Sequence, residues 1–192
     1  MYKRQASAGA ASESMSRDLG WHFLNLGRRI ERALLLIALL RAVLASRETA
    51  EVEVLLLESV LAVAESLTLY RRRFRNRPQF EATLDLLLLD ETNSRSLIYQ
   101  LHAARQHLAV LPGQDGRPYK KEMRLILEAT NLLNLSDAEE LTEADGGTRP
   151  QLDNLLAGLG HRLSETSIAL SATYFTHAER PYQLVDKDMQ AP

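Results

Sequence analysis

The chain has 192 residues, of which 45% are hydrophobic and 25% charged, and its net charge is −2. This size favours a single domain with a well-packed core. The balanced charge argues against a general nucleic-acid or anionic-membrane partner, and the absence of cysteine excludes disulfides and thiolate zinc sites. The longest apolar run, Ala33–Leu40, is too short to cross a bilayer, and no signal peptide precedes it. We therefore expect a cytoplasmic protein.

The two ends of the chain differ from its middle. Residues 1–12 contain a tract of small residues with no element-forming pattern, and Met1–Gln5 resemble a translated sequencing adapter. We expect this segment to be disordered or artefactual, and the reading frame to be cut at its 5′ end. We expect residues 13–178 to form one helical domain and residues 179–192 to be a flexible tail.

Between these ends the apolar residues recur with a helical period almost everywhere. The spacing predicts helices over residues 16–45, 48–73, 80–89, 94–111, 119–135, a short segment from 136, and 150–175. Short connections favour antiparallel neighbours. We therefore expect an all-α fold, an antiparallel helical bundle of five to six helices.

The first predicted helix carries a charged pair, Arg28 and Glu31, on the side opposite its main apolar stripe. Charge in such an apolar helix needs a partner. One interpretation is a preorganised site, in which Glu31 accepts a proton or binds a cation and Arg28 holds an anion. The other is a structural ion pair that locks helix packing.

Two further polar clusters follow. Arg71, Arg72, Arg73, Arg75 and Arg77 form the strongest positive cluster, which fits anion binding, a domain interface or a solvated helix end. Asp85, Asp90 and Glu91 flank a leucine run, but no histidine–carboxylate spacing supports a metal there. The chain has no P-loop, no G-x-G-x-x-G and no G-x-S-x-G. We expect no metal and no cofactor in this chain.

Two blocks resemble the bacterial alpha-E domain, an all-helical family without an assigned biochemical role. The first is Ser16–Ala33, with its G-R-R-I-E-R-A, and the second runs from Tyr70-Arg71 through Leu84–Asp90 to Asn93–Ser96. Position by position, the charged signature of the family falls on Arg28, Glu31, Arg32, Arg71, Arg73, Asp85, Asp90, Asn93 and Arg95. Ser94 stands where many members have proline, and Leu34–Ala38 is apolar where stand-alone members are more polar.

The resemblance implies partners rather than an activity. Members of this family accompany, or are fused C-terminal to, a circularly permuted ATP-grasp domain, and transglutaminase-like peptidases are common neighbours. It therefore implies an accessory domain of an amide- or peptide-forming ligase system, which binds substrate or organises the complex. ATP and magnesium then belong to the ATP-grasp partner, and a peptide is one possible substrate. Two alternatives stay open: a purely structural dimerisation bundle, and an enzyme in which Glu31 is the catalytic general base, helped by Arg28 and Asp85 or Asp90.

Overall fold

The computed structural model describes residues 18–112 and 120–175, and the segments expected to be disordered or flexible, 1–12 and 179–192, lie outside them. The described residues are organised as helices without a strand. The α-helices are α2 (Leu19–Leu44), α3 (Ala50–Val63), α4 (Leu67–Phe74), α5 (Phe80–Leu84), α6 (Leu97–Val110), α7 (Lys121–Asn134), α8 (Ala138–Thr142) and α9 (Pro150–Tyr174). A π-helical segment, η1 (Asp85–Leu89), continues α5. The prediction of an all-α fold is confirmed, but the described ranges hold more helices than the five to six that we expected.

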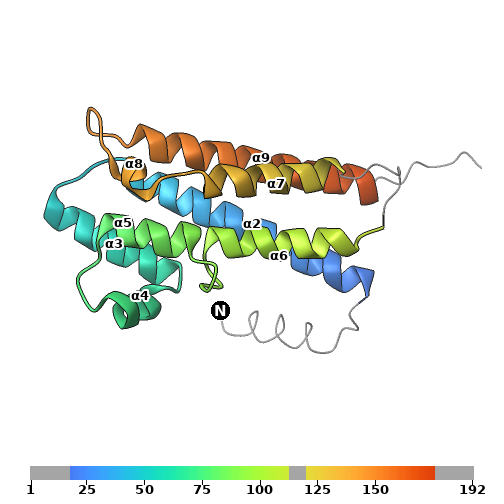
Figure 1. Cartoon of the computed structure of the whole chain (residues 1–192), viewed down its shortest axis with the longest axis horizontal. Coiled ribbons are helices and arrows are strands. Elements are labelled where there is room, and N and C mark those ends of the chain that lie inside the picture. Colours follow the sequence, from blue (N-terminus) through green and yellow to red (C-terminus); the bar gives the residue numbers. More distant parts are fainter. Residues whose placement is uncertain (1–17, 113–119, 176–192) are drawn as a thin grey trace, which may run out of the picture.

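Four long helices make the centre of the molecule. α2 packs against α6 and α9, and α7 packs against α6 and α9, so that the four helices form a closed ring. In Figure 1 neighbouring members of this ring run in opposite directions, while α3, α4, α5 and α8 gather at one end. The core lies inside the ring, where leucine side chains such as Leu40, Leu101 and Leu159 are at most 1% exposed. Burial of this apolar stripe is the main force that holds the helices together.

One predicted helix is broken in the structure. The expected helix over residues 48–73 ends at Val63 and restarts at Leu67. Glu65 adopts the left-handed conformation with φ of 53°, and the Ser66 amide donates to the Leu61 carbonyl over 2.8 Å. This is the Schellman ending of a helix, which glycine usually makes. Because glutamate stands at the turning position, the helical pattern continues across the break and conceals it.

The predicted helix 80–89 also changes character midway. Asp85–Leu89 is π-helical, and the Asp90 amide closes the wider turn by donating to the Asp85 carbonyl over 3.0 Å. The extra residue in the turn keeps three consecutive leucines, Leu86, Leu87 and Leu88, fully buried. Short π-helical segments often lie beside functional sites. Among the described residues, no helix is both long and apolar enough to cross a membrane.

Candidate functional site

Arg32 and Arg95 line one cavity beside the central ring. It has a volume of about 510 Å³ and lies between α2, the α3–α4 turn and the start of α6. We call it the arginine cavity, and its lining residues are Arg32, Leu35, Leu36, Leu39, Val63, Ala64, Glu65, Arg95 and Gln100. One part of the lining is cationic and another is aliphatic. Such a lining suits an anionic group attached to an apolar body.

Arg29 supports the arginine cavity from α2. Its guanidinium group donates to the Gln100 side-chain oxygen over 3.2 Å and lies 5.5 Å from the centre of the Tyr99 ring. Partial burial and the nearby charges of Arg32 and Arg95 lower the pKa of Arg29, while Tyr99 acts in the opposite direction. Three guanidinium groups therefore share one positive region, and this region attracts anions.

The cationic wall is only weakly neutralised. Arg95 pairs with Glu65, but both side chains are substantially exposed, 38% and 57% respectively, and such pairs contribute little. Arg32 makes no hydrogen bond or ion pair with other described residues. A carboxylate entering the cavity can therefore pair with Arg32 and compete with Glu65 for Arg95.

A rigid loop presents Arg95 to the cavity. Asn93, which is 3% exposed, accepts from the Arg95 amide over 3.0 Å and donates to the Leu86 carbonyl over 2.9 Å. Ser96 caps α6 by accepting from the Tyr99 amide, and its hydroxyl donates to the Asp90 carbonyl over 2.7 Å. The loop is thus fixed to both η1 and α6, which limits the positions that the Arg95 side chain can reach.

Asp90 anchors the same loop to α4. The Arg73 guanidinium donates to its carboxylate over 2.6 Å, and the Thr92 hydroxyl and amide donate over 2.7 and 2.9 Å. Burial alone would raise the pKa of Asp90, but these hydrogen bonds and the charge of Arg73 hold it below its usual value. The bonds of Arg73, Asp90 and Asn93 thus hold this loop in place, and the ligand binding that we expected of these residues stays a prediction.

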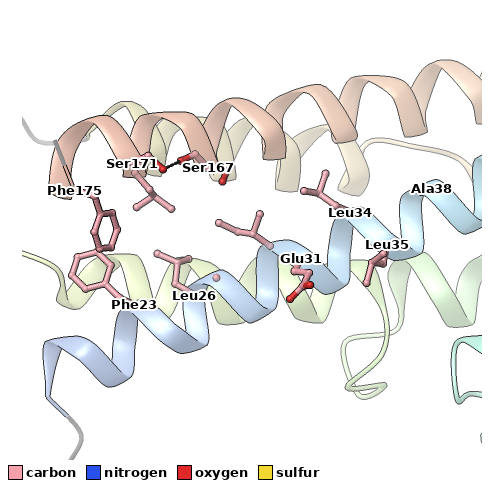
Figure 2. Close-up of a pocket in the computed structure, with 12 residues that line it drawn as sticks. Phe23, Leu26, Glu31, Leu34, Leu35, Ala38, Ser167, Ser171 and Phe175 are labelled. Carbon is pink, nitrogen blue, oxygen red and sulfur yellow. Dashed lines mark hydrogen bonds between the residues drawn. The ribbon is translucent and has the colours of Figure 1, made fainter. Parts of the chain in front are cut away.

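Glu31 lies on another side of α2. It lines the α2–α9 groove, an opening of about 530 Å³ whose walls are Phe23, Leu26, Gly27, Ile30, Glu31, Leu34, Leu35, Ala38, Ser167, Leu170, Ser171 and Phe175. Figure 2 shows the Glu31 carboxylate close to α2 and away from Ser167 and Ser171 of α9. Neither Asp85 nor Asp90 lines this groove.

The remaining expected site residues stand apart. Arg28 lines neither opening and, like Glu31, makes no hydrogen bond or ion pair within the described residues. Arg71 pairs with Glu58 over 3.4 Å, and Asp85 is exposed on η1. The structure thus brings Arg32 and Arg95 together at one cavity and joins Arg73 to Asp90, while Arg28 and Glu31 do not line that cavity.

The sequence patterns did not single out several residues at these sites. Arg29, Gln100 and Glu65 shape the arginine cavity, and Thr92 completes the bonds to Asp90. His22 and His107 also meet, with 3.1 Å between their Nδ1 atoms, although they are far apart in the sequence. Across residues 18–112 and 120–175, no group of three or more potential ligand side chains is arranged to hold a metal ion.

The comparisons with known proteins identify the family. The Alpha-E family, described as a predicted alpha-helical domain with a conserved ER motif, matches residues 1–175. Within that range the sequence contains one Glu-Arg dipeptide, Glu31-Arg32, so the motif places its two side chains at different openings.

The curated relatives are much longer than this chain. Uncharacterized proteins of Mycobacterium bovis and of two Mycobacterium tuberculosis strains are each 39% identical over 167 residues, which is 86% of this chain and 19% of each relative. This chain therefore spans about a fifth of their length. No solved structure matches it. The chain belongs to the Alpha-E family.

Proposed function

We propose that this chain is the accessory domain of an ATP-grasp-type amide or peptide ligase system, and that its arginine cavity binds the carboxylate end of a peptide substrate. The observation that carries the proposal is the convergence of Arg32 and Arg95 on one cavity with an aliphatic wall. A ligase of this class activates a carboxylate through an acyl phosphate. A domain that holds an acid by its carboxylate has a direct use in such a system.

The aliphatic wall narrows the class of substrate. Leu35, Leu36, Leu39 and Val63 line the cavity beside the two arginines. A peptide whose last side chains are aliphatic would bury apolar surface while its carboxylate pairs with the guanidinium groups. Glu65 lines the same cavity and pairs with Arg95. When Arg95 pairs with the substrate carboxylate instead, Glu65 is available for a cationic group of the substrate.

In this proposal the chain provides binding and its partner provides the chemistry. ATP and magnesium belong to the ATP-grasp domain, in cis or in trans, and a transglutaminase-like peptidase is a further partner. The greater length of the mycobacterial relatives is compatible with an arrangement in cis. We place this system in the cytoplasm, where ATP is supplied.

Calorimetric titration with N-acetyl-leucyl-leucine tests the carboxylate site. We expect binding to the free acid and none to its C-terminal amide, because the amide carries no charge. Arg32→Gln and Arg95→Gln should each weaken binding about tenfold, which is the scale of one lost charge-assisted hydrogen bond. Arg105→Gln is the matched control, because Arg105 is an exposed arginine on α6 that does not line the arginine cavity. Equal affinity for acid and amide would contradict the site.

The ligase association has its own test. Long-read sequencing across the gene in its source DNA should find an ATP-grasp reading frame upstream in the same frame or immediately beside it. If neither is present, the association with a ligase is wrong even when the carboxylate titration succeeds.

A further inference from the structure

The outer face of α2 carries a regular stripe whose residues are exposed, apart from Arg28, which is half-buried. Leu24, Arg28, Glu31, Leu35 and Ala38 follow one another at alternating spacings of four and three residues, the a/d spacing of a coiled coil. The buried residues of α2, such as Ile30, Ala33 and Ile37, lie on the opposite side of the helix. We call the exposed stripe the outer seam.

The outer seam is more apolar than a solvated helix face. Leu35 is 64% exposed and Leu24 is 38% exposed, although both are large aliphatic side chains. The α2–α9 groove flanks the seam and adds the exposed ring of Phe175, so the apolar surface continues beyond the helix. Contiguous apolar surface of this kind marks an interaction site.

The order of residues along the outer seam is self-complementary. When a second α2 lies antiparallel about a two-fold axis that passes between Arg29 and Ile30, residues at equal distances from that point face each other. Arg28 then faces Glu31 of the second copy, and Leu24 faces its Leu35. The a positions thereby meet the d positions, as in antiparallel coiled coils, and the two charges of the seam each meet their opposite.

We infer that the outer seam is the homodimer interface of this chain, with two antiparallel α2 helices held in register by two Arg28–Glu31 pairs between copies. This arrangement gives an ion-pair partner to Arg28 and to Glu31, neither of which makes a hydrogen bond or ion pair within the described residues. The leucine layers and the flanking groove would supply the affinity, while the charge pairs exclude other registers. Gly27 lies beside the seam, and a Cβ added there would meet nothing within 4 Å, so a neighbouring helix can approach closely.

Charge exchange on the full chain tests this arrangement by analytical ultracentrifugation. The wild-type chain should sediment as a dimer at micromolar concentration. Arg28→Glu and Glu31→Arg should each weaken dimerisation at least about tenfold, because each creates two like-charged pairs across the axis. The double exchange R28E/E31R should restore the dimer, because the partners swap together.

Mixing the two single variants gives a second readout. Arg28→Glu in one chain and Glu31→Arg in the other restore both opposite-charge layers, so native mass spectrometry with one chain labelled by ¹⁵N should show the heterodimer as the main dimer. Arg105→Glu and Glu51→Arg are matched controls, because both residues are exposed and lie outside the seam. Circular dichroism should show that all variants remain helical.

Three results would overturn the inference. A wild-type chain that stays monomeric at tens of micromolar leaves the outer seam to a different partner. A dimer that survives either single reversal lies elsewhere on the surface. Single variants that are monomeric but are not rescued by the double exchange contradict the antiparallel register. The exchanged residues, Arg28 and Glu31, do not line the arginine cavity, which shares only Leu35 with the outer seam, so the peptide titration tests carboxylate binding separately.

Discussion

Arg149→Met should reduce the free energy of unfolding by about 3 kcal/mol, because it removes the buried partner of an ion pair whose other side chain, Glu53, is 22% exposed. Arg149 is 4% exposed and precedes α9. Its guanidinium group pairs with Glu53, donates to the Ser46 carbonyl over 2.8 Å, and lies 3.8 Å from the centre of the Phe80 ring. One side chain therefore joins the end of α2 to α3, α5 and α9.

Arg41→Met is the matched control for this experiment. Arg41 also joins α2 to α9, through a two-point contact with Asp153 over 2.6 and 3.2 Å, but this pair is exposed. Exposed ion pairs contribute little, so we expect the control to unfold close to the wild type. Urea titrations followed by circular dichroism measure both variants. If Arg149→Met is no more destabilising than Arg41→Met, Arg149 does not organise this end of the bundle.

Arg149 also illustrates what the sequence could and could not predict. Its neighbour Pro150 correctly predicted where α9 begins, because proline suits the first helical turn. Nothing in the local pattern indicated that Arg149 would be buried. Its partners are carbonyl groups and side chains at the end of α2, in α3 and in α5, which the fold brings together around it. The helical period shows which residues face inward, but it does not predict which buried polar groups will meet.

The candidate site, too, could be predicted from the sequence only in part. The charged signature drew attention to Arg32 and Arg95, and the structure places them at one cavity. The same signature also included Arg73, Asp90 and Asn93, which hold the loop before α6. Residue type and spacing cannot separate a group that contacts a ligand from one that positions its neighbour. Gln100 and Glu65 complete the cavity through contacts made by the fold.

Asp90 provides the sharpest test of that positioning role, because its effect should depend on pH. Asp90→Asn should cost about 2 kcal/mol of stability at pH 7, since the 8% exposed carboxylate loses its charge-assisted bond to Arg73. The pKa of Asp90 is lowered in the folded chain, so the folded state favours the ionised form. Its contribution to stability is therefore complete above the unfolded pKa of about 4 and disappears as pH falls through the lower, folded value.

The difference in unfolding free energy between the wild type and Asp90→Asn should accordingly shrink as the pH falls below about 4. Asp153→Asn is the matched control. The pKa of Asp153 is also lowered, mainly by the hydrogen bond from Arg41, but this carboxylate is exposed. Replacing it should therefore change stability much less.

Asp90→Asn should also weaken binding of N-acetyl-leucyl-leucine, because the loop that presents Arg95 loses its bond to α4. Normal peptide affinity together with lost stability would show that Asp90 supports the fold without positioning Arg95. If Asp90→Asn is as stable as the wild type at pH 7, the bond between Arg73 and Asp90 contributes little to the stability of the fold or to the position of Arg95.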